Sequence, residues 1–314
     1  MSLRKIIPLV LFISVTALNG SADLSFQSAE AGTYGFDTGI VKGKMIAEGA
    51  SQGIVALTDD SSGQDIAYGK PNPGIFSYYR IFSTNKRYGD AVRDWPRTAT
   101  VLPDGALRIH WPAQPEHPLE ITAVYRWKSG DTLDLETEVK PQQTMPKFEV
   151  FLSSYFSKNF RGRIYAKPGS HAPGKPAFLD VDVNLLVRGT YLAFPRDLRA
   201  AQIIYDGRWD YEPNPVQFSL TQQLEAPLCM RQDNQSGISV VMMSRPQDCF
   251  AIATPYNMEP PDGVAGHNSL YFSLFGYDLQ AGQTAKAFTR MVVMKNGADD
   301  TAVERYRQFI EETK

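Results

Sequence analysis

Cysteine and histidine are scarce in this sequence, which has two cysteines and four histidines in 314 residues. No pair of histidines has metal-ligand spacing, and the HExxH, EF-hand, GxSxG, P-loop and GxGxxG motifs are all missing. Metal, nucleotide and serine-hydrolase sites therefore have no support from the sequence. We predict a protein without a cofactor.

An excess of charge of one sign is also missing. The chain has 32 basic and 34 acidic residues, which are well mixed, and a formal net charge of −2. Binding to a phosphate backbone needs a basic stripe or patch, and the sequence contains none. This excludes nucleic acid from the expected partners. The oligomeric state stays open.

Long hydrophobic runs are absent apart from one short segment at the N-terminus. Residues 6–18 are mostly apolar and follow two basic residues, while Gly20 and Ala22 fit the small positions before a cleavage site. A membrane-spanning helix needs about 20 apolar residues. We therefore predict a signal peptide over residues 1–22 and an exported protein, periplasmic or extracellular, whose mature chain does not span the membrane. A retained anchor or a buried first strand is the alternative.

The two cysteines, Cys229 and Cys249, are predicted to form a disulfide, because export exposes thiols to an oxidising compartment. The turn-forming sequence QDNQSG lies between them and suggests that they occupy paired antiparallel strands. Such a disulfide would contribute about 3 kcal/mol in the chain-entropy estimate. A reactive thiol pair is the alternative, but no CxxC spacing supports it.

Most of the mature chain has the pattern of short β-strands separated by clusters of proline, glycine, asparagine and aspartate. The predicted strands include residues 53–58, 75–83, 148–156, 163–166, 201–205, 216–220, 237–243, 250–254, 270–275 and 287–294. No shift in composition marks a linker and no internal repeat is present. We predict a single β-sandwich domain over residues 23–314.

The clearest antiparallel hairpin covers residues 119–140. On its second arm Leu133, Leu135 and Val139 alternate with acidic residues, and Ser129-Gly130-Asp131 forms the turn. One face of this hairpin is therefore buried and its acidic face is solvated.

A helix is predicted over residues 301–313, where Thr301 and Glu304 form a capping-box pattern and an apolar stripe follows. The helix covers a sheet surface or edge. Together these patterns predict an all-β protein, a large antiparallel super-sandwich or distorted barrel with a C-terminal α-helix.

Three passages resemble aldose 1-epimerases (galactose mutarotases): FEVFLSSYF at 148–156, DCFAIATPYNMEPPDG at 248–263 and YDLQAGQTAKAFTRMVV at 277–293. The resemblance implies a galactose mutarotase-like super-sandwich and a saccharide ligand. The family places an imidazole acid where this chain has Ser154, and a glutamate base near residues 250–252, where no acid stands. The chain thus resembles a divergent member that lacks the family's catalytic residues at the expected positions.

Candidate catalytic residues lie in and near the irregular loop at residues 256–268. His267 and Glu259 are proposed as an acid/base pair, because an imidazole near a carboxylate can move protons near neutral pH. Tyr155 or Tyr271 would assist, and Asp262 would bind substrate. The alternative for each is a surface or structural side chain.

A binding groove is predicted from basic and aromatic residues that suit sugars and uronates, since rings pack on pyranose faces and guanidinium groups bind carboxylates. Its expected members, besides Asp262 and Tyr271, are Arg80, Arg87, His110, Trp209 and Tyr211. The alternatives are a solvated cationic strand end, a core histidine, and a loop folded over the core.

The function that the sequence favours is that of an exported carbohydrate-active protein, which binds an oligosaccharide or a uronate in a β-sandwich groove. Whether it performs epimerase, lyase or hydrolase chemistry is left open. A non-catalytic carbohydrate-binding or envelope-assembly protein is the alternative.

Overall fold

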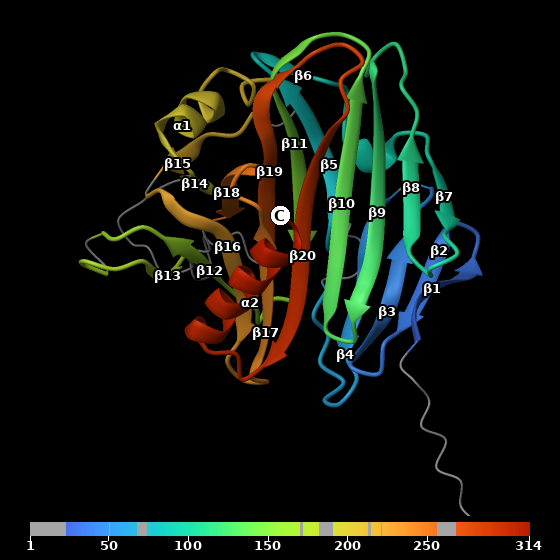
Figure 1. Cartoon of the computed structure of the whole chain (residues 1–314), viewed down its shortest axis with the longest axis vertical. Coiled ribbons are helices and arrows are strands. Elements are labelled where there is room, and N and C mark those ends of the chain that lie inside the picture. The colour runs from blue at the N-terminus through green and yellow to red at the C-terminus, as the bar shows by residue number, and fades with distance from the viewer. Residues whose placement is uncertain are drawn as a thin grey trace, which may run out of the picture.

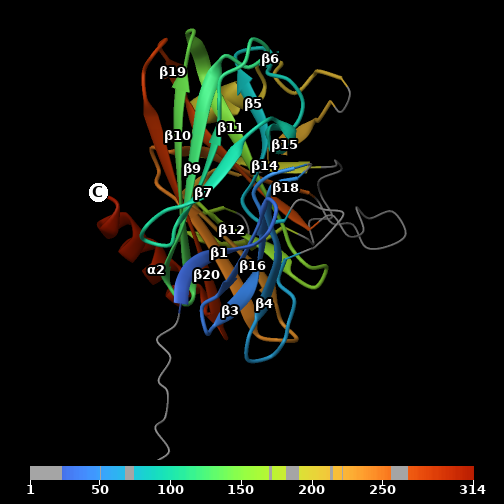
Figure 2. The same ribbon diagram turned by 90° about the vertical axis from the view of Figure 1, so that its right-hand side faces the viewer.

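The computed structural model describes residues 23–49, 51–67, 74–169, 172–181, 191–212, 215–220, 222–255 and 268–314. The predicted signal peptide lies outside the described residues. Strands dominate the described chain and form three sheets (Figures 1 and 2).

The largest sheet has nine antiparallel strands. Their order is β13 (Ala177–Asp180), β12 (Arg161–Ala166), β16 (Leu224–Asp233), β17 (Ile238–Ser244), β20 (Ala285–Lys295), β10 (Thr132–Pro141), β9 (Leu119–Ser129), β8 (Leu107–Trp111) and β7 (Thr98–Val101).

A second sheet has seven strands and includes one parallel pair, β14 with β15. Its order is β15 (Phe218–Leu220), β14 (Tyr191–Pro195), β18 (Cys249–Pro255), β19 (Ser269–Leu279), β11 (Met145–Tyr155), β5 (Ser77–Ser83) and β6 (Lys86–Arg87).

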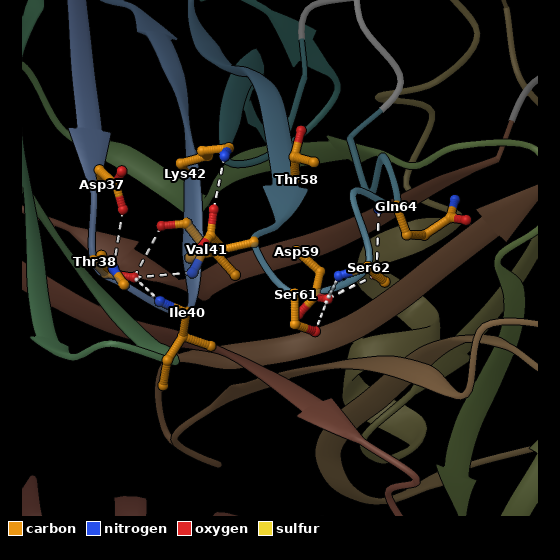
Figure 3. A network of polar contacts seen from close by, with 12 residues as sticks. Asp37, Thr38, Ile40, Val41, Lys42, Thr58, Asp59, Ser61, Ser62 and Gln64 are labelled. Carbon is orange, nitrogen blue, oxygen red and sulfur yellow. Dashed lines mark hydrogen bonds and ion pairs between the residues drawn. The ribbon is translucent and has the colours of Figure 1, made fainter.

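The N-terminal sheet has four strands: β1 (Asp23–Glu30), β2 (Thr33–Asp37), β3 (Val41–Ile46) and β4 (Gly53–Asp59). Side-chain oxygens close its turns (Figure 3). Thr38 Oγ1 accepts from Val41 N at 3.0 Å and donates to Gly130 O at 2.7 Å, which fastens this sheet to the β9–β10 turn.

The main core lies between the nine-stranded and seven-stranded sheets, where alternate residues of both sheets meet. Tyr78 of β5 shows the contact: its ring lies 4.9 Å from that of Trp111 on β8, and its hydroxyl bonds Thr137 of β10. Burial raises the pKa of Tyr78 above its usual value, so this phenol stays protonated in the core.

The hairpin predicted at residues 119–140 is confirmed as β9 and β10. Leu133, Leu135 and Val139 are fully buried, and they pair with Trp127, Tyr125 and Ile121. The acidic face is paired with cations, since Arg290 contacts Asp134 and Lys286 contacts Glu136 and Glu138.

The C-terminal helix α2 (Asp299–Glu312) begins two residues before the predicted start. Its N-cap is Ala298 and makes no side-chain cap hydrogen bond, so the capping box expected at Thr301 is not formed. Ala302 and Phe309 pack on β16, β17 and β20, and α2 therefore covers the outer face of the nine-stranded sheet (Figures 1 and 2).

The strand predicted at residues 201–205 is wrong, because this segment belongs to the helix α1 (Leu198–Ile204). Asp197 caps the helix by accepting from Ala200 N at 2.8 Å. Ala200, Ile203 and Ile204 pack on the outer face of the seven-stranded sheet. A short apolar run does not distinguish a helix from a strand.

The predicted disulfide is not formed in the structure. Cys229 and Cys249 are buried free thiols, which donate to the carbonyls of Met242 and Ala251. Cys229 lies on β16 and pairs with β17 as expected, but the chain then crosses to the other sheet, where β18 pairs with β14 and β19. The two cysteines therefore do not occupy paired strands. Burial raises the pKa of both thiols.

Candidate functional site

A β-bulge in β5 places two adjacent side chains on the outer face of the seven-stranded sheet. Arg80 pairs with Phe151 and Tyr78 with Leu152, so Tyr79 is the additional residue in β5. Tyr78 turns into the main core, whereas Tyr79 and Arg80 both reach the outer cluster around Phe151 and Trp209. Bulges commonly re-aim side chains in this way near functional sites.

The guanidinium of Arg80 is buried and makes no ion pair within the described residues. Arg80 is only 5% exposed. Its Nη2 donates to the Tyr79 hydroxyl at 2.9 Å, and its guanidinium lies 4.7 Å from the centre of the Tyr79 ring. A second ring, that of Trp209, lies 5.7 Å away. Aromatic faces stabilise a cation only in part, and a buried charge is costly without an anionic partner.

A second guanidinium approaches the same tyrosine ring. Arg93 belongs to the 3₁₀ helix η1 (Val92–Asp94), and its guanidinium lies 4.6 Å from the centre of the Tyr79 ring. Its Nη1 is buried and has no hydrogen-bond partner among the described residues. Two cationic groups therefore meet on Tyr79, which makes this position suited to an anion.

Three tyrosines continue the site along the sheet: Tyr155 on β11, Tyr271 on β19 and Tyr191 on β14. The Tyr271 ring centre lies 6.4 Å from that of Tyr155 and 6.3 Å from that of Tyr191. Burial raises the pKa of Tyr271 well above its usual value, and burial likewise raises that of Tyr191. Both phenols are therefore protonated near neutral pH and can donate hydrogen bonds.

The segment after α1 forms the other wall of the site. Trp209 is 5% exposed, and its ring lies 4.5 Å from Phe82, 4.6 Å from Phe151 and 5.0 Å from Phe218. It therefore packs on the sheet through most of its surface. For this segment the sequence left two possibilities, a wall of a binding groove or a loop folded over the core. The burial of Trp209 favours the loop folded over the core.

A buried ion-pair cluster holds that segment in place. Arg208 donates to Glu149 Oε2 at 2.7 Å, to both carboxylate oxygens of Asp206 at 2.9 Å and to Lys147 O at 2.9 Å. Because Glu149 and Lys147 lie on β11, this arginine joins the wall directly to the sheet.

Arg87 and Tyr211 lie beside this wall, but their side chains form hydrogen bonds mainly with backbone carbonyls. Arg87 donates to the carbonyls of Tyr211 and Glu212, and the Tyr211 hydroxyl donates to Asn85 O. Tyr211 remains 40% exposed. Burial and the charge of Arg80 lower the pKa of Arg87.

Of the remaining predicted residues, the structure describes His110, which lies away from this site. His110 is on β8 of the nine-stranded sheet, half-buried, with Nδ1 3.1 Å from Thr122 Oγ1. His267, Glu259 and Asp262 fall outside the described residues. Ser154, which stands at the family's imidazole position, is buried and accepts from Phe76 N at 3.1 Å.

Sequence reasoning selected Arg80, Tyr155, Trp209 and Tyr271, which the structure brings onto one face. It missed Tyr79, Arg93 and Tyr191. The two consecutive tyrosines before Arg80 were a usable signal for Tyr79, whereas no local sequence pattern distinguishes Arg93 or Tyr191.

Other kinds of site have no candidates in the part of the chain that the structure describes. No group of three or more histidine, cysteine, aspartate or glutamate side chains there could hold a metal ion. No described helix is long and apolar enough to cross a membrane.

Comparison with known proteins finds no matching family model and no matching curated protein. Solved structures do match. The Slr1438 protein from Synechocystis sp. PCC 6803 is 14% identical with a TM-score of 0.53, over 88% of this chain and 99% of that one. The galactose mutarotase related enzyme from Lactobacillus acidophilus is 10% identical with a TM-score of 0.50, over 85% of this chain and 99% of that one.

A larger protein contains the same fold as one part. Alpha-N-acetylgalactosaminidase NagBb from Bifidobacterium bifidum is 10% identical with a TM-score of 0.52, and the match covers 92% of this chain but 39% of that one. At these identities the similarity concerns the fold alone. The chain has a galactose mutarotase-like β-sandwich fold, as the resemblance predicted.

Proposed function

We propose that this chain is an exported saccharide-binding protein whose ligand carries a carboxylate, such as an oligosaccharide with a uronate unit. The binding site is the outer face of the seven-stranded sheet around Tyr79, Arg80, Arg93 and Tyr271. The observation that carries the proposal is Arg80, a buried cation without an ion-pair partner among the described residues. An anionic ligand would supply that partner.

The chemistry of the neighbouring side chains suits a sugar acid. Guanidinium groups bind carboxylates through paired hydrogen bonds, and Arg80 and Arg93 approach the same ring. Tyrosine hydroxyls can donate to ring and hydroxyl oxygens of a sugar, and tyrosine faces can pack on its apolar face. The names of two proteins of similar fold, a galactose mutarotase related enzyme and a glycosidase, also refer to sugars.

Binding is tested by titrating hexagalacturonate into the mature protein and measuring its affinity calorimetrically, with maltohexaose as the neutral comparison. We expect the acidic hexasaccharide to bind, and to bind less tightly as salt is added. Hydrogen bonds to charged groups contribute about 1.5–3 kcal/mol, so Arg80→Gln should weaken binding by about tenfold or more.

The matched control is Arg108→Gln, since Arg108 is an exposed arginine on β8 of the other sheet. Its removal should leave the affinity unchanged. The proposal fails if no acidic oligosaccharide binds, or if Arg80→Gln and Arg108→Gln reduce the affinity equally.

A second candidate function is an enzyme that uses acid/base chemistry on the same ligand. Tyr155 contributes to the tyrosine cluster of the site, and His267 with Glu259 is the acid/base pair expected from the sequence. Incubation of the bound oligosaccharide with wild-type protein and His267→Ala tests this function. Products formed by the wild type and not by the variant would establish an enzyme, and an unchanged oligosaccharide in both would leave a binding protein.

A further inference from the structure

A separate cavity lies beside Trp209, between the end of α1 and the segment that leads into β15. It has a volume of about 320 Å³, and its lining includes Tyr205, Trp209, Asp210 and Gln217. This volume is within the range of small-molecule sites, which starts near 300 Å³. The cavity has room for one sugar ring.

The aromatic side chain at its edge is exposed but held in position. Tyr205 is 61% exposed, yet its hydroxyl donates to Phe218 O at 2.9 Å. Of the four large apolar side chains that are exposed among the described residues, Tyr205 is the one that lines this cavity.

Polar groups face the cavity without partners. Asp210 and Gln217 are exposed, and neither side chain makes a hydrogen bond or an ion pair within the described residues. A carboxylate and an amide together offer acceptors and donors to the hydroxyls of a sugar. An aromatic face beside such groups can hold the apolar face of a pyranose.

The base of the cavity is rigid. Trp209 is fixed by three aromatic neighbours, and Arg208, the preceding residue, is held by Glu149 and Asp206. A site that is already ordered binds with a smaller entropic cost.

The charge around the cavity selects against acidic sugars. Asp210 lines it and Glu212 is exposed nearby in sequence, whereas no basic side chain is among its described lining residues. An anionic ligand would be repelled by the carboxylate of Asp210. We propose that this cavity is a second saccharide site, which takes a neutral pyranose unit and is distinct from the arginine site.

The two sites share Trp209. Its ring lines the cavity and also lies 5.7 Å from the guanidinium of Arg80. Binding at the cavity should therefore change the fluorescence of this tryptophan even when the arginine site is disabled.

The test is a titration of the mature protein with two neutral hexasaccharides, cellohexaose and laminarihexaose, followed by calorimetry and tryptophan fluorescence. We expect at least one to bind. Tyr205→Ala should weaken that binding by about tenfold, because the ring supplies the stacking face. Arg80→Gln should leave it unchanged, so loss of the arginine site and loss of this site give different results.

Matched variants keep the result interpretable. Leu198→Ala removes another exposed apolar side chain, which belongs to α1 and does not line the cavity, and it should have no effect. Gln217→Ala removes an exposed side chain and should weaken binding. Tyr205→Phe keeps the ring but loses the hydrogen bond to Phe218 O, so it should bind more tightly than Tyr205→Ala. The inference is overturned if neither of the neutral hexasaccharides binds, or if Tyr205→Ala and Gln217→Ala both bind as tightly as the wild type.

Discussion

The guanidinium of Arg208 lies 2.7 Å from the carboxylate of Glu149, and their side chains are 0% and 2% exposed. Arg208 belongs to the segment after α1, and Glu149 belongs to β11 in the middle of the seven-stranded sheet. The pair therefore fixes the covering segment to the sheet. It also positions the next residue, Trp209, which both proposed sites use.

Removal of one partner of this pair should destabilise the protein strongly. Breaking a buried ion pair costs about 3–5 kcal/mol, because the remaining charge is left without a partner. We expect Arg208→Met to lower the free energy of unfolding by about that amount, as measured by urea denaturation. Adding Glu149→Leu to this variant should recover part of the loss.

An exposed ion pair provides the comparison. Arg126 contacts Asp104 at 2.6 Å, but these side chains are 40% and 52% exposed. Arg126→Met should leave the unfolding midpoint nearly unchanged, since solvent-exposed pairs contribute little. Equal effects of Arg208→Met and Arg126→Met would contradict the structural role assigned to the buried pair.

Asp59 should stabilise the β4 turn in a way that depends on pH. Its side chain is 1% exposed, and Oδ2 accepts from Ser61 Oγ, Ser62 Oγ and Ser62 N (Figure 3). Burial acts to raise the pKa of Asp59, but these hydrogen bonds and Lys295 outweigh burial, so its pKa lies below the ordinary value of 3.8.

Because the folded pKa is depressed, this stabilisation is present above the ordinary pKa of Asp59 and is lost as the pH falls through the lower folded value. Asp59→Ala should reduce the free energy of unfolding by about 2 kcal/mol near neutral pH, and the difference from wild type should narrow in acid. The neighbouring Asp60, whose side chain is 41% exposed, is the control. Asp60→Ala should have little effect at any pH.

His117 should make the protein less stable below neutral pH. Its ring stacks on Trp95 with centres 3.6 Å apart and planes 4° apart, and the residue is 6% exposed. Burial lowers the pKa of His117 below its ordinary value of 6.5, although Glu116 acts in the opposite direction. The unfolded chain therefore takes up the proton more readily than the folded protein does.

The stabilisation from neutral His117 is complete above the ordinary pKa and is lost as the pH falls through that value and the lower folded one. Urea midpoints measured from about pH 8 to about pH 5 should fall less in His117→Phe than in the wild type, because phenylalanine keeps a ring beside Trp95 but does not titrate. The half-buried His110 on β8 serves as the comparison. The prediction is contradicted if the urea midpoint of His117→Phe falls with pH as much as that of the wild type, while the midpoint of His110→Phe falls less.

The sequence predicts the parts of the fold that follow from local patterns of apolar and polar residues. Leu133, Leu135 and Val139 alternate with acidic residues, so the period of two identifies β10 and its buried face without reference to any other strand. The resemblance then supplies the architecture. The helix α1 was missed because it is only seven residues long, and so short an apolar segment suits a strand equally well.

The sequence indicates only part of the candidate site, because that site depends on pairings between distant strands. Arg80 and Trp209 were found by residue type alone. The bulge that puts Tyr79 beside Arg80 exists only relative to β11, about 70 residues further along the chain. Tyr191 and Arg93 reach the site through the packing of β14 and η1, which no local pattern encodes.

The two cysteines offer a last test, since whether they can form a disulfide depends on the sheet to which each of their strands belongs. Cys229 and Cys249 are buried on different sheets, and burial raises the pKa of both thiols. A buried thiol with a raised pKa forms little thiolate and reacts slowly. We expect the purified native protein to be unreactive with Ellman's reagent and to show two thiols once it is unfolded under non-reducing conditions. Cys249→Ala should show one. A thiol count near zero after unfolding would contradict the structure, because it would mean that the chain oxidises across the two sheets to the disulfide that the sequence predicts.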